Sequence, residues 1–307
     1  MIKATNLTKR FEDFTALDAI SCEIGEGMIY GLVGSNGAGK STLIRALTGV
    51  YRPDGGEVCL DGERIFDNPR AKARIAYVPD ELFFLPNASM ERMSLLYESY
   101  FPNFSRERYR ELAARFDLDV KKSVNTFSKG MRRQAATALS LAARADYVFF
   151  DETFDGLDPI MRLLVKNIVC EDMLERGATT VITSHSLREL EGICDNLAFL
   201  HKGGLVLQSD VQSLKCERFK IQIAFHDDYD RSRFAGIDLV SFEKNGSVSS
   251  LIVKGEREEI AARLSALSPV LLDILPLTLE EVFTYEMEAL GYTRRAESAP
   301  EEGGSKQ

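Results

Sequence analysis

The chain has 307 residues, of which 45% are hydrophobic, and its formal net charge at pH 7 is −9. This composition is that of a globular protein, and the length allows one large domain together with a small one. The acidic balance argues against a nucleic-acid partner, because no broad cationic face would be available to neutralise phosphates.

The sequence indicates neither a disulfide framework nor a membrane span. The five cysteines are odd in number and scattered, with no C-x-x-C pair, so we expect reduced and mostly buried thiols. The first residues lack the basic and apolar regions of a signal peptide, and no apolar run approaches about 18 residues. We therefore expect a cytoplasmic protein that reaches the inner face of the cell membrane only through partner subunits.

The first elements lead to a glycine-rich loop. Strands are expected around Ile2–Ala4 and Ile20–Ile24, with a loop over Thr8–Phe14 between them. Met28–Val33 is short and apolar enough to be a buried strand, and Leu43–Thr48 has helical spacing. The segment between this strand and this helix matches G-x-x-x-x-G-K-[ST], in the strand–loop–helix context that a phosphate-binding loop needs.

This loop predicts binding of a nucleoside triphosphate. Its glycines let successive N–H groups point inward, and the helix that follows adds the partial positive charge of its N-terminus. Lys40 would reach the β- and γ-phosphates, and the Ser41 hydroxyl would contact Mg²⁺. The nucleotide-binding residues predicted in the loop are Gly34, Ser35, Asn36, Gly37, Ala38, Gly39, Lys40, Ser41 and Thr42.

Short strands and then helices are expected between the loop and residue 145. Asp61-Gly62 is a strong turn signal, and Ser89 and Ser105 are suitable N-caps for apolar residues that recur at helical intervals. The expected elements are strands at Gly56–Leu60 and Ile75–Val78 and helices at Met90–Tyr100, Arg106–Phe116 and Lys129–Arg144.

An acidic pair follows the next buried strand. Tyr147–Phe150 is an apolar run that delivers Asp151 and Glu152 at its end. One carboxylate at this position can hold Mg²⁺, and the next can polarise the attacking water. The alternation of strands and helices indicates an α/β sheet. Its later elements are expected at Pro159–Glu175 (helix), Thr179–Thr183 (strand), Ser186–Cys194 (helix), Asn196–His201 and Leu205–Gln208 (strands).

From Phe219 onward the pattern changes to β-α-β-β-α-β, which is similar to a split β-α-β, ferredoxin-like module. Its strands are expected at Phe219–Phe225, Leu239–Glu243, Val248–Val253 and Val270–Leu275, and its helices at Tyr229–Phe234 and Glu256–Leu267, with a last helix at Thr278–Leu290. We expect domains at residues 1–215 and 216–292, and a disordered tail at residues 293–307.

Further motifs surround the acidic pair in a fixed order. Phe127–Met131 opens the helix before the acidic strand, Gly156–Asp158 follows the pair, and His185 ends the next strand. With the Lys40 loop, these segments make residues 2–215 resemble the ATP-binding subunit of ABC transporters. The resemblance implies an α/β P-loop NTPase of ABC type, with an antiparallel β subdomain and an inserted helical subdomain at about residues 84–145.

The resemblance also implies roles for single residues. Glu152 would be the catalytic carboxylate, His185 would contact the γ-phosphate, and Lys40 would complete the catalytic set. Phe11 would stack on adenine, although Phe14 competes for that role and we favour Phe11. Mg²⁺ would be held by residues of three segments: Ser41, Asp151 and Asp80.

Two copies of the chain, or this chain and a related subunit, are implied to sandwich ATP. Ser128 and Gly130 of one copy would grip the nucleotide of the other, and Asp158 would lie in the loop beside it. Closing and opening this dimer would pull on membrane-spanning permease subunits. The single nucleotide domain, the Asp80-Glu81 pair and the segment Leu277–Phe283 are most similar to the bacitracin-exporter-like group, which implies export of a drug, a peptide antibiotic or a lipid.

Two segments depart from the pattern of the family. The signature, usually Leu-Ser-Gly-Gly-Gln, reads Phe-Ser-Lys-Gly-Met here, and Lys129 would either help to bind phosphate or point to solvent. Where the family typically has a glutamine, the chain has Asp80 followed by Glu81. Asp80 is therefore predicted as a metal contact, with a solvated loop carboxylate as the alternative.

Several alternatives stay open at this point. Leu82–Pro86 is either an exposed interface for a membrane subunit or part of the helical subdomain core. The C-terminal module is either structural, as padding or as support for a dimer, or regulatory, although the sequence offers no ligand motif for regulation. The rival functions are a soluble ABC-type ATPase acting on ribosomes or DNA, and a P-loop phosphotransferase that would not need Ser128 and Gly130 from a second copy.

Overall fold

The computed structural model describes residues 1–154, 156–216 and 218–289. They form two compact units, the first over Met1–Gln212 and the second beginning at Ser213. The predicted tail at residues 293–307 lies outside the described residues. Across the described ranges, no helix combines the length and the apolar character needed to cross a bilayer.

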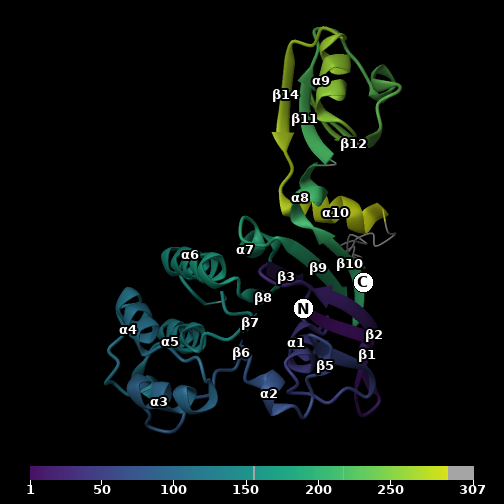
Figure 1. Cartoon of the computed structure of the whole chain (residues 1–307). Coiled ribbons are helices and arrows are strands. Elements are labelled where there is room, and N and C mark those ends of the chain that lie inside the picture. Colours follow the sequence, from purple (N-terminus) through teal and green to yellow (C-terminus); the bar gives the residue numbers. More distant parts are fainter. Residues whose placement is uncertain (155, 217, 290–307) are drawn as a thin grey trace, which may run out of the picture. The chain divides into compact units, whose positions relative to one another are not determined.

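The smaller sheet of the first unit is antiparallel, in the order β2-β1-β4-β5 (Figure 1). The loop predicted over Thr8–Phe14 is wrong, because the hairpin continues until Phe11 pairs with Phe14. Glu12 takes the positive φ that a two-residue hairpin turn requires, so polar strand residues stay paired up to the turn. The strands are β1 (Ile2–Phe11), β2 (Phe14–Ile24), β4 (Gly55–Leu60) and β5 (Glu63–Arg64).

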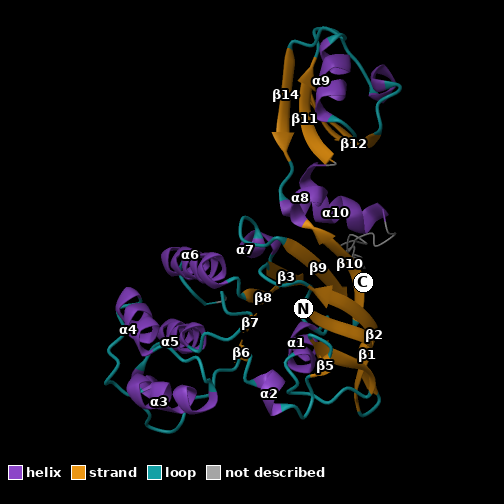
Figure 2. Cartoon of the chain, viewed as in Figure 1, coloured by secondary structure: helices purple, strands orange, loops and turns teal. Residues whose placement is uncertain are grey.

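The larger sheet has six strands in the order β10-β9-β3-β8-β7-β6, and all neighbours are parallel except the edge strand β10 (Figure 2). Parallel strands end at the same edge of a sheet, so the segments that follow β3, β7 and β8 meet there. The strands are β3 (Ile29–Val33), β6 (Ile75–Val78), β7 (Tyr147–Asp151), β8 (Thr179–Ser184), β9 (Asn196–His201) and β10 (Gly204–Asp210).

The core of this unit joins both sheets around the first helix. Leu43, Ile44 and Leu47 of α1 are buried in one cluster with side chains from β1, β2, β3 and β7. The helices of the unit are α1 (Lys40–Leu47), α2 (Pro69–Lys72), α3 (Met90–Tyr100), α4 (Arg106–Arg115), α5 (Lys129–Ala142), α6 (Pro159–Arg176) and α7 (Leu187–Leu190), with a 3₁₀ turn at η1 (Val124–Thr126). This arrangement fixes the helix that follows the phosphate-binding loop.

Most of the expected helices are confirmed. Ser89 and Ser105 cap α3 and α4 as expected, and α3, α4 and α5 lie together at one end of the unit (Figure 1). The helix expected at Ser186–Cys194 is only four residues long, since the chain is extended at Glu191 and Gly192 has a positive φ.

The second unit is built on an antiparallel sheet in the order β12-β13-β11-β14, with α9 packed on the core face (Figure 2). A four-residue 3₁₀ segment, η2, stands where the first helix of the module was expected. The ferredoxin-like assignment stays a prediction. The elements are α8 (Val211–Cys216), β11 (Arg218–Ala224), η2 (Arg231–Phe234), β12 (Leu239–Asn245), β13 (Val248–Lys254), α9 (Arg257–Ser265), β14 (Leu271–Pro276) and α10 (Leu279–Ala289).

Candidate nucleotide site

The glycine-rich loop runs from the end of β3 to the start of α1. Two of its glycines stand where no side chain fits: a Cβ on Gly34 would lie 2.5 Å from the carbonyl oxygen of Leu200, and one on Gly39 would lie 2.8 Å from that of Ala16. Gly39 also has a φ of 104°. The loop residues between them that face solvent are Ser35, Asn36 and Gly37, whereas Ala38 is buried.

Lys40 is the first residue of α1, and its side chain is only 4% exposed. The ammonium donates to the carbonyl oxygens of Gly34 at 2.7 Å and Ser35 at 3.2 Å, so it lies in the hollow of its own loop. It also forms an ion pair with Glu152, at 3.2 Å from Oε1. The lysine and the acidic pair predicted from distant segments are thus in direct contact.

Asp151 ends β7 and is fully buried. The hydroxyls of Thr183 and Ser41 donate to Oδ1 at 2.8 and 3.2 Å, and the hydroxyl of Tyr77 donates to Oδ2 at 3.2 Å. Burial raises the pKa of this carboxyl group, and the three hydroxyl donors oppose that rise. A buried carboxylate next to a serine hydroxyl offers the hard oxygen ligands that Mg²⁺ prefers, so the residues fit this ion.

Glu152 adopts an unusual backbone conformation, with a φ of 48°. Its N–H donates to Thr183 Oγ1 at 2.9 Å, so one threonine side chain contacts both members of the acidic pair. A left-handed conformation at a non-glycine residue costs free energy and is typical of functional sites. The turn directs the Glu152 side chain toward Lys40 instead of along the strand axis.

The signature segment begins α5. The Ser128 hydroxyl oxygen accepts the N–H of Met131 at 3.2 Å and caps this helix. A Cβ on Gly130 would lie 3.7 Å from the carbonyl oxygen of Gly156, so the signature packs close to the loop that follows the acidic pair. Lys129 extends over Gly156, because its Nζ would lie 4.0 Å from a Cβ built on that glycine.

Asp158 and His185 are exposed and lie on the segments that follow β7 and β8. Asp158 caps α6, because its Oδ1 accepts the N–H groups of Ile160 and Met161, each at 3.0 Å. His185 directly follows β8, at the same edge of the sheet as the phosphate-binding loop. In the described part of the chain, the hydrogen bonds of Ser128 and Asp158 are those of helix caps and do not reach Lys40.

The two aromatic candidates for adenine stacking face each other across the β1–β2 hairpin. Phe11 is 40% exposed and Phe14 is 63% exposed. The ring of Phe11 stands edge-on to that of Tyr51, with ring centroids 5.4 Å apart and an interplanar angle of 73°. The Lys9 ammonium also lies over the Phe11 ring, 5.4 Å from its centroid, so Phe11 is held by two neighbours while the residue stays partly exposed.

Asp80 is paired with a helix of the inserted subdomain. Its Oδ1 accepts from Nη2 of Arg133 on α5 at 2.6 Å. Arg133 is only 2% exposed, and its Nε and Nη1 are buried without a hydrogen-bond partner among the described residues. The contact makes Asp80 the counterion of a buried guanidinium, and its predicted role as a metal contact stays a prediction.

Sequence reasoning missed Tyr77 and Thr183, which hold the carboxylate of Asp151. Both lie on strands that flank β7 in the sheet, Tyr77 on β6 and Thr183 on β8. The place of Thr183 at the end of β8, two residues before the predicted His185, was the available signal for this residue. For Tyr77 the order of strands in the sheet had to be known first.

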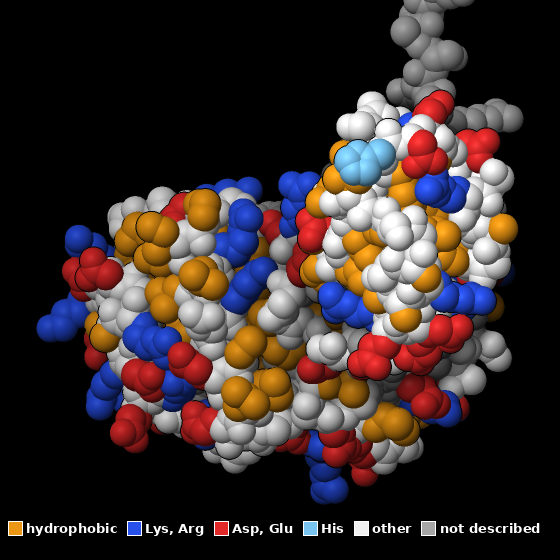
Figure 3. Space-filling model, turned by 90° about the horizontal axis from the view of Figure 1, so that it is seen from above, with side chains coloured by type: hydrophobic (Ala, Val, Ile, Leu, Met, Phe, Trp, Pro, Cys, Tyr) orange, Lys and Arg blue, Asp and Glu red, His pale blue; other side chains and the backbone are white. Residues whose placement is uncertain are grey.

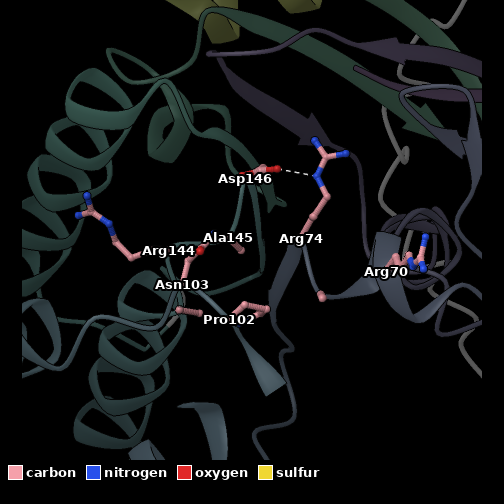
Figure 4. Close-up of a pocket in the computed structure, with 9 residues that line it drawn as sticks. Arg70, Arg74, Pro102, Asn103, Arg144, Ala145 and Asp146 are labelled. Carbon is pink, nitrogen blue, oxygen red and sulfur yellow. Dashed lines mark hydrogen bonds and ion pairs between the residues drawn. The ribbon is translucent and has the colours of Figure 1, made fainter. Parts of the chain in front are cut away.

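A pocket of about 270 Å³ lies at the opposite edge of the large sheet, at the amino ends of β6 and β7 (Figure 4). Arg74 and Asp146 face each other across it and are hydrogen-bonded at 2.6 Å, whereas Arg70 and Arg144 point away (Figure 4). The pocket is separated from the Lys40 loop by the length of the strands, so it is not part of the candidate site.

Charged side chains of both signs are found on the surface (Figure 3). Among the described residues visible in Figure 3, basic and acidic side chains are interspersed over the surface. Phe83, in the apolar segment Leu82–Pro86, is 77% exposed, so at least this side chain is outside the core of the helical subdomain.

Comparison with known proteins identifies the family. The family model for ABC transporters matches residues 17–155. The ABC transporter ATP-binding protein YtrB of Bacillus subtilis (strain 168) is 31% identical over 284 residues, which cover 92% of this chain and 97% of YtrB. The bacitracin transport ATP-binding protein BcrA of Bacillus licheniformis is 30% identical over 218 residues, which cover 70% of this chain and 71% of BcrA.

A solved structure agrees in fold. The dimeric ATP-binding cassette MJ0796, bound to ADP and Pi in a post-hydrolysis state, matches with a TM-score of 0.63 and 21% identity, covering 69% of this chain and 99% of MJ0796. The predicted resemblance is confirmed, and so is the predicted ABC-type α/β fold, whereas the C-terminal ferredoxin-like module stays a prediction. The chain therefore belongs to the ABC transporter family, among its ATP-binding proteins.

Proposed function

We propose that this chain is the ATP-hydrolysing subunit of an ABC transporter, which powers export of a drug, a peptide antibiotic or a lipid through separately encoded membrane subunits. The observation that carries the proposal is the direct contact of Lys40 with Glu152, beside the buried carboxylate of Asp151. The similarity to a bacitracin transport protein supports the class of transported molecule.

The proposed chemistry follows from this contact. The backbone N–H groups of residues 34–39 and the ammonium of Lys40 bind the phosphates, which displace Glu152 from its ion pair with Lys40. The released carboxylate then orients the attacking water, and His185 contacts the γ-phosphate from the end of β8. Ser41 and Asp151 would hold Mg²⁺, which would supply charge stabilisation on the phosphoryl oxygens.

The site is completed by a second copy of the chain in this proposal. Ser128 accepts the N–H of Met131 and still has its hydroxyl proton to donate to the γ-phosphate of the partner's ATP. Gly130 presents a backbone N–H in the first turn of α5, where the helix dipole favours an anion. Asp158 lies in the loop beside them. The dimeric form of MJ0796 supports this arrangement.

Contact with membrane subunits is proposed at the exposed apolar segment Leu82–Pro86. Phe83 is 77% exposed, and an exposed aromatic side chain in a loop is typical of a protein interface. The segment begins two residues after Asp80, whose carboxylate is tied to α5. A pull on this loop would therefore reach the helix that carries the signature.

Two substitutions test the proposal. Lys40→Ala is expected to abolish nucleotide binding, and Glu152→Gln is expected to keep binding but to lower the steady-state rate of ATP hydrolysis at least about 100-fold. The Glu152→Gln variant should also dimerise when ATP and Mg²⁺ are added, as measured by light scattering.

Matched controls are Lys121→Ala and Glu107→Gln, two exposed positions on the helical subdomain that should leave the rate unchanged. Hydrolysis at the wild-type rate after either substitution in the site would contradict the proposal. A Glu152→Gln variant that stays monomeric with ATP would contradict the shared site.

A further inference from the structure

The carboxylate of Asp151 has more support than the motif residues supply. Ser41 and Thr183 donate to Oδ1, and Tyr77 is the donor to Oδ2. In the proposed function the Ser41 hydroxyl turns toward the metal ion. Thr183 and Tyr77 are then the side chains that keep a fully buried carboxylate in one orientation, one on each oxygen.

Tyr77 belongs to a larger set of contacts, which includes Arg45 and Tyr51 and lies farther from the predicted metal ligands. Arg45, one turn along α1 from Ser41, donates from Nη1 to the Tyr51 hydroxyl at 3.0 Å. Its guanidinium carbon lies 5.7 Å from the centroid of the Tyr51 ring. Hydrogen bonding to the Tyr77 hydroxyl raises the pKa of Arg45, against the effect of burial. The Arg45 guanidinium is thus hydrogen-bonded to Tyr51 and interacts electrostatically with Tyr77.

Tyr51 in turn contacts the base side of the site. Its ring stands edge-on to Phe11, the residue expected to stack on adenine. Tyr51 comes from the loop after α1, Tyr77 from β6 and Phe11 from the end of β1. Two of these segments reach Arg45, a side chain of the helix that follows the phosphate-binding loop, and Phe11 is connected to it through Tyr51.

We propose that Arg45, Tyr51 and Tyr77 are positioning residues that hold the adenine-stacking ring and the metal-binding carboxylate at a fixed separation along the nucleotide. The inference rests on the proposed function of the Lys40 site. None of the three touches the reacting phosphate: Tyr77 acts through Asp151, Tyr51 acts through Phe11, and Arg45 acts through both tyrosines.

The physical reason is preorganisation. A carboxylate that loses the donor on one oxygen can rotate, and a buried oxygen without a donor costs free energy. The Tyr77 hydroxyl should therefore matter for the response to Mg²⁺ and not for the contacts of the base. The Tyr51 hydroxyl, by holding Arg45 and the ring beside Phe11, should matter for the affinity of the nucleotide without metal.

The test measures binding of a fluorescent ATP analogue to the full chain carrying Glu152→Gln, so that the nucleotide is not consumed. Affinity is determined in EDTA and then as a function of Mg²⁺ concentration. Tyr77→Phe should raise the Mg²⁺ midpoint about tenfold and change the affinity in EDTA less than about twofold, the scale of one hydrogen bond to a charged group. Tyr51→Phe should instead weaken the affinity in EDTA about tenfold and change the Mg²⁺ midpoint less than about twofold.

Arg45→Gln should change both quantities, and Arg45→Lys, which keeps the charge, should restore part of each. The matched control is Tyr100→Phe, an exposed tyrosine on α3, which should change neither. A purely structural role would move both quantities together in each tyrosine variant. That outcome, or an unchanged Mg²⁺ midpoint in Tyr77→Phe, would overturn the inference and leave the proposed function standing.

A parent protein that binds no nucleotide would overturn the proposed function and this inference with it. Nucleotide binding by the Glu152→Gln chain without further substitutions therefore distinguishes failure of the proposed function from failure of this inference. The tyrosine variants remove a single oxygen atom each, so loss of the fold is not expected to obscure the result.

Discussion

Asp151 illustrates how a single functional residue is kept at the expense of stability. Its carboxylate is fully buried, and burial raises the pKa of the group despite three hydroxyl donors. Removing a charged group from water costs free energy that hydrogen bonds only partly offset. In the proposed function, this residue would thus serve the metal ion that it binds and not the stability of the fold.

We therefore expect Asp151→Asn to raise the free energy of unfolding of the nucleotide-free protein by about 1 kcal/mol, because an amide keeps an acceptor for Thr183 and carries no charge. The same substitution should abolish the response of nucleotide affinity to Mg²⁺. Urea denaturation in EDTA measures the first effect. Asp13→Asn, an exposed control in the β1–β2 turn, should change neither, and a less stable Asp151→Asn protein would refute the argument.

Residues of the candidate site differ in how far the sequence alone could reveal them. Lys40, Ser41, Asp151 and Glu152 were predictable, because their motifs are local and each follows an apolar strand. Their contact in the structure agrees with that prediction. Tyr77 could not be predicted in the same way, since its importance depends on β6 being the neighbour of β7.

At the scale of elements, the contact between the loop after β6 and α5 was also outside the reach of local patterns. Asp80 and Arg133 are 53 residues apart, and a motif comparison suggested a metal contact for Asp80. The ion pair ties this loop to the helix that begins with the signature. Helix and strand periodicity predicted β6 and α5 but carried no information on the contact between α5 and the loop after β6.

The ion pair predicts a stability effect that needs no metal. Asp80→Ala leaves a buried guanidinium without its counterion, so the free energy of unfolding in EDTA should fall by about 2 kcal/mol. Replacing both partners, as Asp80→Ala with Arg133→Met, should recover most of the loss, because no buried charge remains. A metal ligand would give no such pattern in EDTA.

Glu81→Ala is the matched control for this pair, since Glu81 is exposed and is the next residue in the loop. Urea denaturation of the single and double variants measures the coupling between Asp80 and Arg133 directly. Additive losses in the double variant would show that the two side chains do not stabilise the protein through each other.

At the scale of the whole molecule, the two units have separate hydrophobic cores. The core of the first unit surrounds α1, and that of the second lies between its antiparallel sheet and α9. All predicted site residues lie in the first unit. The change of pattern near residue 216 led to the prediction of domains at residues 1–215 and 216–292, and the boundary between the two compact units falls between residues 212 and 213.

Calorimetry of the full chain should accordingly resolve two unfolding transitions, of which nucleotide shifts only one. In the Glu152→Gln variant, ATP and Mg²⁺ at about 100 times the dissociation constant should stabilise the binding unit by about 2.7 kcal/mol, because ligand binds the folded state alone. For a unit of this size the corresponding rise in Tm is about 5–10 °C. The other transition should stay in place, as both should in Lys40→Ala. An equal rise in Tm of both transitions would instead mean that nucleotide binding also stabilises the C-terminal unit. That unit would then be coupled to the nucleotide site.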